Sequence, residues 1–188
     1  MTSQNYLEQF YKIVRAQPRL MQILQCLAQS QPNAYVAAGV LRHVVWAHLH
    51  EREYEILHTE IDVIFFDSTA RHIEARLKAK LEQEFSNIAW DVTNQAFVHE
   101  WYRTDQGARI KPLSSVKDAL SMWPETATAL ALRIKKDGDF ELIAPFGLDD
   151  LFELKLRWNA NLVSYAVFEQ RMLSKQFLQK WQRLTLEK

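Results

Sequence analysis

The ten residues 58–67, HTEIDVIFFD, combine a strongly apolar run with closely spaced acids. The apolar residues between 61 and 66 are typical of a strand in the interior of a sheet. Glu60 and Asp62 lie two positions apart, which on a strand places both carboxylates on the same face, roughly 6–7 Å apart. Because burying like charges is costly unless a positive group balances them, this pair predicts a bound cation or a basic partner.

Upstream of this strand, residues 34–51 (AYVAAGVLRHVVWAHLHE) predict a short strand, a glycine and then a helix. The start of such a helix presents free backbone N–H groups and the positive end of the helix dipole, which suits an anion such as phosphate. Gly39 would let the backbone approach closely. Arg42, three residues later, would be placed to hold a phosphate through two hydrogen bonds. The alternative for Arg42 is a simple surface charge.

Downstream, Asp91 lies in the sequence AWDVT, within a third strand predicted over 87–95. Carboxylates from neighbouring strands can share one or two Mg²⁺ ions, which prefer oxygen ligands and also bind substrate phosphates. Glu60, Asp62 and Asp91 are therefore candidate metal ligands and catalytic residues for phosphoryl or nucleotidyl transfer. The alternative for Glu60 and Asp62 is a strand edge whose acids face solvent or pair with Lys or Arg.

The rest of the chain predicts helices interleaved with strands. Helices are expected over 4–29 with a division at Pro18, over 69–85, over 114–123, near Leu148 and over 162–184, with a short helix or strand extension over 96–103 and a hairpin at Asp137-Gly138. This predicts an α/β (α+β) fold in which helices pack around a mixed sheet. We expect a single domain over 1–188, with an N-terminal helical segment (1–33), a core (34–158) and a C-terminal helix (159–188).

The composition is that of an ordinary globular protein without a strong overall charge. Lys and Arg together number 23, as do Asp and Glu, so any binding to nucleic acid must rest on a local patch. The single cysteine, Cys26, is expected to pack in a core and has no disulfide partner. We find no signal-peptide pattern and no apolar run long enough to span a bilayer. The sequence therefore predicts a cytoplasmic protein without a membrane partner.

Five blocks of sequence resemble a known family. They are AAGVLRHVVW, IDVIFFD, WDVTNQA, WPETATA and APFGLDDLF. Together they resemble the polymerase-β-like nucleotidyltransferase superfamily, and most closely a bacterial family of small predicted nucleotidyltransferases. An arginine three residues after the glycine also resembles the tRNA CCA-adding branch. The resemblance runs from about residue 35 to residue 158 and implies a mixed sheet of the nucleotidyltransferase type.

The activity that the resemblance implies is transfer of a nucleotidyl group from a nucleoside triphosphate (NTP) to a hydroxyl group, with Mg²⁺ or Mn²⁺ as cofactor. The acceptor of that group is open: it is a small molecule, a protein or an RNA. The family pattern would bind the nucleotide phosphates through Ala38, Gly39 and Arg42. In this phosphate-binding part, the chain departs from the pattern in two places. Ala38 occupies the position of the first glycine, and His43 replaces the acid or amide that follows the arginine.

The same resemblance assigns the three acids. Glu60 and Asp62 would hold both metal ions, and Asp91 would complete one metal site and help to deprotonate the acceptor hydroxyl. Glu60 stands where an aspartate is usual, so its carboxylate reaches one methylene further. An acid is nevertheless kept at each metal position.

Two further blocks of the resemblance carry polar residues without an independent mechanism. Thr126 and Thr128 in WPETATA are candidates for contacts with the nucleotide. Asp149 and Asp150 either add an acid to the site or cap the helix that starts near Leu148, where acids favour the dipole. These alternatives stay open on the sequence alone.

The remaining aromatic residues and histidines mostly favour structural roles. Trp101 and Trp123 lie near polar segments and are the tryptophans most suited to stack on a base. Asp67 is expected to cap the helix that follows it, with Ser68 or Thr69 as the alternative caps. A zinc site is disfavoured, because the histidines between residues 43 and 58 fall on different sides of a helix and the lone cysteine is remote.

Three other functions compete with nucleotidyl transfer. One is a nucleotide-binding or regulatory module of the same fold that catalyses no transfer. Another is a phosphohydrolase, which would release phosphate without an acceptor. The last is a toxin-like enzyme that modifies tRNA, which would need a basic patch beside the site.

Overall fold

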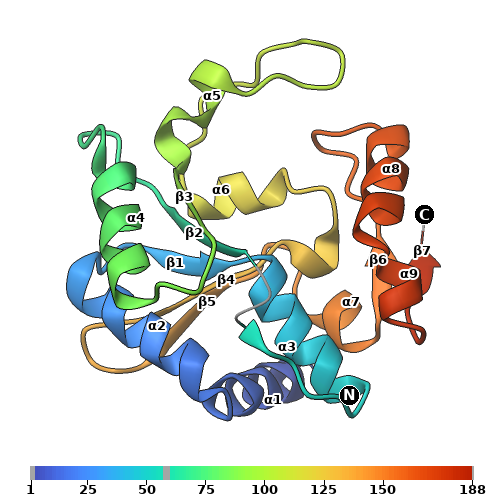
Figure 1. Cartoon of the computed structure of the whole chain (residues 1–188). Helices are drawn as coiled ribbons and strands as arrows, with labels where there is room; N and C mark the ends of the chain where they lie inside the picture. The colour runs from blue at the N-terminus through green and yellow to red at the C-terminus, as the bar shows by residue number, and fades with distance from the viewer. Residues whose placement is uncertain (1–2, 57–59, 188) are drawn as a thin grey trace.

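The computed structural model describes residues 3–56 and 60–187 (Figure 1). A five-stranded sheet in the order β3-β2-β1-β4-β5 lies at its centre. The strands are β1 (Tyr35–Ala37), β2 (Ile61–Phe65), β3 (Trp90–Asn94), β4 (Ala131–Ile134) and β5 (Phe140–Ile143). β2 and β3 run parallel, whereas β1 is antiparallel to both β2 and β4, and β4 to β5. The sheet is therefore mixed, as predicted.

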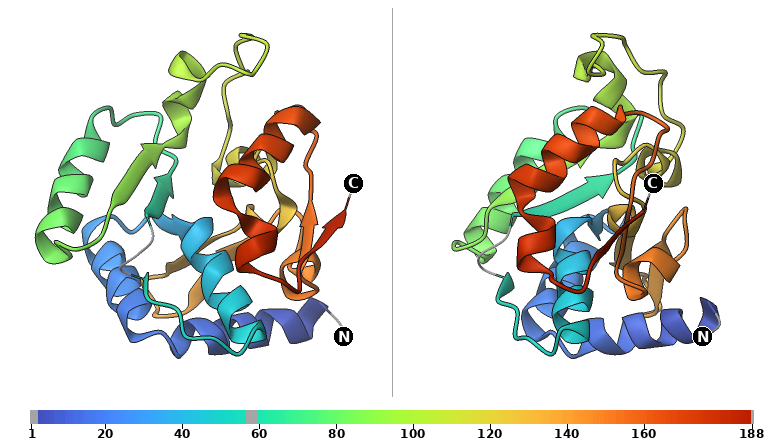
Figure 2. Two further views of the ribbon diagram at one scale, coloured as in Figure 1. Left: turned by 45° about the vertical axis from the view of Figure 1, so that its right-hand side comes forward. Right: turned by 90° about the vertical axis from the view of Figure 1, so that its right-hand side faces the viewer.

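Helices cover both faces of this sheet (Figures 1 and 2). The helices are α1 (Ser3–Arg15), α2 (Pro18–Ser30), α3 (Gly39–Leu49), α4 (Ile73–Glu84), α5 (Val98–Trp101), α6 (Val116–Ser121), α7 (Asp149–Phe152), α8 (Tyr165–Lys175) and α9 (Phe177–Lys180). Short 3₁₀ turns are η2 (Gln95–Phe97) and η3 (Thr126–Thr128). α1 to α4 share one large core with the sheet, whereas α6 packs on the opposite face in a small separate cluster. Pro18 begins α2, which places the predicted division between α1 and α2.

The alternation of side chains along β2 explains how an apolar strand carries an acid. Ile61, Val63 and Phe65 are each 0% exposed and belong to the large core. Ile64 points the other way and joins the small cluster under α6. Because successive side chains on a strand point to opposite faces, Asp62 also lies on the face away from the large core.

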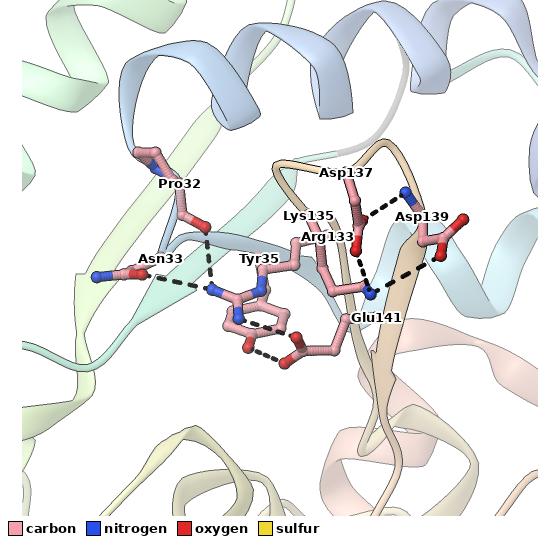
Figure 3. Close-up of polar contacts among 8 residues, drawn as sticks. All are labelled: Pro32, Asn33, Tyr35, Arg133, Lys135, Asp137, Asp139 and Glu141. Atoms are coloured by element: carbon pink, nitrogen blue, oxygen red, sulfur yellow. Dashed lines mark hydrogen bonds and ion pairs between the residues drawn. The ribbon is translucent and has the colours of Figure 1, made fainter.

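The hairpin of β4 and β5 turns at Asp137-Gly138, as the sequence predicts. Gly138 has a φ of 87°, which favours glycine, and the Lys135 N–H donates to the Asp139 carbonyl at 2.8 Å. The Asp137 carboxylate accepts hydrogen bonds from the Lys135 ammonium group at 2.9 Å and from the Asp139 N–H at 3.0 Å. These contacts close the turn (Figure 3).

A polar network ties β1 to this hairpin (Figure 3). Glu141 accepts from the Tyr35 hydroxyl at 2.6 Å and from Arg133 at 2.9 Å, and the Arg133 guanidinium lies 4.7 Å from the centre of the Tyr35 ring. Burial is the main cause that raises the pKa of Tyr35, and the Tyr35 hydrogen bond is the main cause that lowers the pKa of Glu141. Arg133 also donates to the Pro32 carbonyl, which fixes the loop before β1.

The helix predicted over 69–85 begins later, at Ile73. The Asp67 carboxylate accepts from the Thr69 N–H at 2.9 Å, from the Thr69 hydroxyl at 2.7 Å and from the Ala70 N–H at 3.1 Å. These bonds, above all the one from the Thr69 hydroxyl, lower the pKa of Asp67. Asp67 therefore closes a turn before the helix, and the prediction that it caps α4 is wrong. His72, in a left-handed conformation, is the residue that precedes α4.

The closing helix predicted over 162–184 is also different. α8 ends at Lys175, and Gln176 adopts a left-handed conformation with a φ of 54° that redirects the chain into α9. This break lets Phe177 reach the core, where it is 2% exposed. The chain then forms β7 (Thr185–Glu187), which pairs in parallel with β6 (Lys155–Arg157) in a second small sheet. No described helix is both long enough and apolar enough to cross a bilayer.

Candidate functional site

The three acids predicted from the sequence line one cavity. Asp62 on β2 pairs in register with Asp91 on the parallel strand β3, so their carboxylates lie on the same face of adjacent strands. Glu60 immediately precedes β2 and is exposed, as is Asp91, whereas Asp62 is half-buried. The cavity has a volume of about 560 Å³ and also includes Gly39 and Arg42 at the start of α3.

The charges around Asp62 are not balanced by the protein. Burial, followed by the nearby carboxylates of Asp91 and Glu60, raises the pKa of Asp62 to about 6. A hydrogen bond from the Gly39 N–H and the charge of Arg171 act in the opposite direction but do not compensate. The site therefore holds repelling carboxylates that a cation would relieve.

The acids of this cavity fit a divalent metal ion that is bound in part by its substrate. Within residues 3–56 and 60–187, no three His, Cys, Asp or Glu side chains form a group that could hold a metal ion by themselves. Mg²⁺, however, is usually bound through one or two carboxylates, several waters and the phosphates of the substrate. Asp62 and Asp91, adjacent and mutually repelling, fit such an open site. A hydrogen bond of 3.0 Å from the Thr93 hydroxyl orients Asp91.

The turn into α3 differs from the phosphate-binding turn of the family pattern in its residue at position 38 and in the partner of the Gly39 N–H. Ala38 has φ 56° and ψ −121°, a conformation that favours glycine, and its N–H donates to the Leu130 carbonyl at 3.0 Å. The N–H of Gly39, predicted to bind a phosphate, donates to Asp62 in this structure. A Cβ built on Gly39 would lie 4.0 Å from both Arg42 and Asp62, so the turn and the acid are in direct proximity.

Arg42 is a buried residue, so the alternative of a simple surface charge is wrong. Its side chain is 3% exposed and lies 4.5 Å from the ring centre of Phe177 and 4.9 Å from that of Trp46. The guanidinium donates to the Thr128 hydroxyl at 2.7 Å and to His43 Nε2 at 2.9 Å. Burial lowers the pKa of Arg42 to about 10. Arg42 thus borders the cavity, while its two terminal nitrogens already have internal partners.

His43 is the partner that keeps Arg42 in place. Because a guanidinium donates only, His43 Nε2 must accept, which leaves Nδ1–H to donate to the Tyr54 hydroxyl at 3.1 Å. Burial, followed by the charge of Arg42, lowers the pKa of His43 to about 2, so the ring is neutral. His43 also stacks on Trp181 with 5.7 Å between ring centres. Both ring nitrogens of His43 therefore have partners within the protein; His58 lies outside the described residues.

Three cations that sequence reasoning missed complete the cavity. Arg171 and Lys175 on α8, and Lys180 on α9, line it opposite the acids. We call this space the basic cavity. The spacing of Arg171 and Lys175 places both on one face of α8, but helix periodicity alone does not say which face meets the acids. Arg171 donates to Glu125 at 2.5 Å, and Glu125 is 0% exposed.

A second cavity, also of about 560 Å³, adjoins the first. The two cavities share Asp62, Asp91 and Arg171. Apart from these, the second cavity is lined mainly by apolar residues from β2, α5, α6, α8 and the loops between them. We call it the apolar cavity. Both tryptophans singled out from the sequence, Trp101 and Trp123, line it.

The other candidate polar residues have structural roles. The Thr126 hydroxyl donates to Asp150 at 2.7 Å, and Arg157 holds the same carboxylate at 2.9 Å. Asp149 and Asp150 lie in the first turn of α7 and line neither cavity, so Asp150 does not add an acid to the site. Thr128 is bound to Arg42 inside the fold and is 1% exposed.

Comparisons with known proteins agree with this architecture. A family model described as Nucleotidyltransferase matches residues 26–186. A solved structure described as an NMR structure that reveals a CCA-adding enzyme head domain is 27% identical, with a TM-score of 0.79, and the match covers 96% of this chain and 95% of that one. These matches confirm the resemblance to the polymerase-β-like nucleotidyltransferases. No curated protein matches the chain.

Two enzymes with bound ligands share the fold at lower identity. The Thermotoga maritima CCA-adding enzyme complexed with tRNA is 16% identical, with a TM-score of 0.60, and the match covers 95% of this chain but 42% of the enzyme. A CCA-adding enzyme in complex with CTP is 17% identical, with a TM-score of 0.62, and the match covers 95% of this chain but 43% of the enzyme. The chain therefore spans less than half of these two enzymes.

Proposed function

The chain belongs to the nucleotidyltransferase family, and we propose that it transfers a nucleotidyl group from an NTP to a hydroxyl group of an acceptor, with Mg²⁺ or Mn²⁺ as cofactor. The observation that carries this proposal is the position of Asp62 and Asp91, side by side where the basic cavity meets the apolar cavity. In the reaction, the acceptor oxygen bonds to the α-phosphorus and the bond to the bridging oxygen breaks. Pyrophosphate is the leaving group.

The basic cavity is the part suited to the triphosphate. Lys175, Lys180 and Arg171 supply positive charge on the side facing the acids, and Arg171 is fixed in orientation by Glu125. A guanidinium held in this way loses less conformational freedom when it binds a phosphate. We assign these three cations, and not Arg42 alone, to the phosphate chain.

The wall of the same cavity also includes Ala38, Gly39 and Arg42. Arg42 reaches this wall from the inside, where Thr128 and His43 hold its guanidinium. Its charge supports a nearby phosphate through space, and its bond to Thr128 ties α3 to η3.

Glu60, Asp62 and Asp91 are the residues that would hold the metal ions. When bound, the metal would neutralise charge on the phosphates and make the acceptor hydroxyl more acidic. Asp91 borders both cavities, is exposed and is oriented by Thr93. We assign to Asp91 the role of receiving the proton of the acceptor hydroxyl, because it is the carboxylate most accessible from the apolar cavity.

The test is a thermal-shift titration with Mg²⁺ or Mn²⁺ and each NTP, on the native protein and on Asp62→Asn and Asp91→Asn. A ligand at a hundred times its Kd stabilises the native state by about 2.7 kcal/mol, which shifts Tm by several degrees. We expect this shift in the native protein and in the control Glu82→Gln, an exposed acid on α4. We expect it to be lost in both aspartate variants. Equal shifts in all four proteins would contradict the metal–nucleotide site.

A second assay separates transfer from binding alone. Release of pyrophosphate in the presence of an acceptor, but not of orthophosphate, is the result expected of a transferase. One alternative is a module that binds nucleotide without transferring it. Two observations favour it: Ala38 adopts a glycine conformation, and the Gly39 N–H is already bound to Asp62. Metal-dependent NTP binding with no pyrophosphate from any acceptor would establish that alternative. Orthophosphate release from the nucleotide alone would indicate a phosphohydrolase.

A further inference from the structure

The apolar cavity differs in chemistry from the basic cavity that it adjoins. Its wall carries Trp101, Tyr102, Met122 and Trp123, together with aliphatic side chains such as Val167 from α8. The polar residues in the wall, such as Thr93 and Gln170, are uncharged, apart from the shared Asp62, Asp91 and Arg171. A concave, mostly apolar space of several hundred Å³ with a few convergent polar groups is typical of a site for a small molecule.

The charges of this cavity do not suit a nucleic acid. Among the described residues, Arg171 is the one cation that lines it, and it is already paired with the buried Glu125. Two carboxylates face the same space. A single-stranded RNA is normally held by a positively charged groove along its backbone as well as by aromatic stacking. Among the described residues that line the apolar cavity, the aromatic side chains are present without a row of cations beside them.

The neighbouring surface supports the same conclusion. A further cavity, of about 410 Å³, lies beyond the apolar one and contains Arg109 and Lys111 together with Asp118. The wall that the two cavities share consists of Ile110, Leu113, Met122 and Leu162, all apolar. The two cations of this further cavity are therefore separated from Asp62 and Asp91 by apolar side chains and are partly offset by Asp118.

We propose that the apolar cavity binds the acceptor, and that the acceptor is an uncharged small molecule with a hydroxyl group on an aromatic, apolar body. This rests on the proposed nucleotidyl transfer. The body of the acceptor lies against Trp101 and Trp123, and its hydroxyl points to Asp91 at the junction of the cavities. The hydroxyl oxygen bonds to the α-phosphorus, its proton passes to Asp91, and pyrophosphate leaves through the basic cavity.

The test uses 2-naphthol as a neutral hydroxylated aromatic probe, naphthalene-2-sulfonate as its anionic counterpart, and a short single-stranded RNA. Binding to the full chain is measured by calorimetry, which does not depend on turnover. The variant is Trp101→Ala, because this side chain is 63% exposed and its loss leaves the core intact. The matched control is Leu173→Ala, equally 63% exposed and on α8 but outside both cavity walls.

We expect saturable binding of 2-naphthol that weakens about tenfold in Trp101→Ala and is unchanged in Leu173→Ala. The sulfonate and the RNA should bind more weakly than 2-naphthol and should not displace it. A second variant, Val167→Arg, brings a cation into the cavity and should reverse the preference between the neutral and the anionic probe. Binding of 2-naphthol that is the same in Trp101→Ala and native protein would overturn the proposal. So would RNA that displaces the probe, and that result would assign the cavity to a nucleic acid.

The same samples separate this inference from the proposed function. If metal and NTP stabilise the protein but 2-naphthol does not bind, the acceptor inference fails alone. If 2-naphthol binds as expected but metal and NTP have no effect, the proposed transfer fails and the acceptor role falls with it. If both the metal–NTP pair and 2-naphthol bind, radiolabel from an α-labelled NTP should appear on 2-naphthol. Radiolabel that appears on the RNA and not on 2-naphthol would also overturn the proposal.

Discussion

At the scale of single residues, Asp62 is where burial and charge conflict most directly. Its pKa is raised to about 6 by burial and by the carboxylates of Asp91 and Glu60, against about 3.9 for an aspartate in an unfolded chain. Between these two pH values the folded protein binds a proton that the unfolded chain does not. The contribution of Asp62 to the free energy of unfolding therefore falls as the pH rises from about 4 to about 6. Above about pH 6 the ionised Asp62 destabilises the folded protein to the full extent.

The first prediction concerns Asp62→Asn without metal. We expect the variant to be more stable than the native protein at pH 7.5, because the amide carries no charge at any pH. The stability difference between variant and native protein should be about 2 kcal/mol larger at pH 7.5 than at pH 4.5. The measurement is urea denaturation at both pH values, with Glu82→Gln as the control that should show no such difference. A stability gain that is independent of pH would mean that Asp62 is not a repelled carboxylate.

The second prediction concerns Ala38, a residue held in a glycine conformation at φ 56°. Replacing it by glycine removes backbone strain of roughly 1–3 kcal/mol from the folded state. The greater flexibility of glycine also stabilises the unfolded chain, but by a smaller free energy. Ala38→Gly should therefore stabilise the protein by about 1 kcal/mol. The control is Ala37→Gly in the extended strand β1, which should lose about 1 kcal/mol. Loss of stability in both variants on urea denaturation would rule out backbone strain at Ala38.

At the scale of elements, α8 is tied to the core by an ion pair with unequal ends. Glu125 is 0% exposed, whereas the Arg171 side chain is 35% exposed. Glu125 Oε2 and the nearby Arg42 Nε are buried without a hydrogen-bond partner in the described part of the chain. The segment before η3 therefore depends on Arg171 more than α8 depends on Glu125.

The third prediction follows from this inequality. Arg171→Ala leaves a buried carboxylate without its partner and should cost about 3–5 kcal/mol. Glu125→Gln leaves an arginine that can reach water, and should cost only about 1–2 kcal/mol. The double variant should be more stable than Arg171→Ala alone, since it contains no buried charge at position 125. Urea denaturation of the three variants measures this order, and equal losses in both single variants would contradict it.

At the scale of the whole molecule, a net charge of zero hides a local separation of charge. The 23 basic and 23 acidic residues cancel in total, yet Arg171, Lys175 and Lys180 gather opposite the three acids. The two cavities meet at this point and differ in polarity. This arrangement gives the NTP and its acceptor separate approaches to one reacting centre.

The fourth prediction tests the basic cavity as a unit. Lys175→Ala and Lys180→Ala should each weaken metal–NTP binding by about tenfold, because each removes a cation facing the phosphates. Both lysines are exposed, so stability without ligand should change by less than about 0.5 kcal/mol. The control is Lys136→Ala, an exposed lysine of the β4–β5 hairpin, with unchanged binding. Calorimetry with Mg²⁺ and an NTP decides, and an affinity unchanged in both variants would remove these lysines from the phosphate site.

The sequence by itself determined the elements whose physics is local. Alternation along β2 placed Asp62 away from the large core, Pro18 separated the first two helices, and Asp137-Gly138 set the hairpin turn. The proximity of Asp62 and Asp91 was also predictable, because consecutive strands joined by a helix commonly lie side by side. These signals act within a few residues or follow general rules of connection.

Only the tertiary structure decided what depends on distant partners. The burial of Arg42 requires Thr128 from η3 and Phe177 from α9, and the break at Gln176 that brings Phe177 inward carries no glycine or proline signal. The positions of Arg171 and Lys180 opposite the acids follow from how α8 and α9 pack, which helix periodicity does not specify. The physical reason is that a residue's neighbours in a chain fix its backbone, whereas its charge environment depends on segments that meet only in the folded protein.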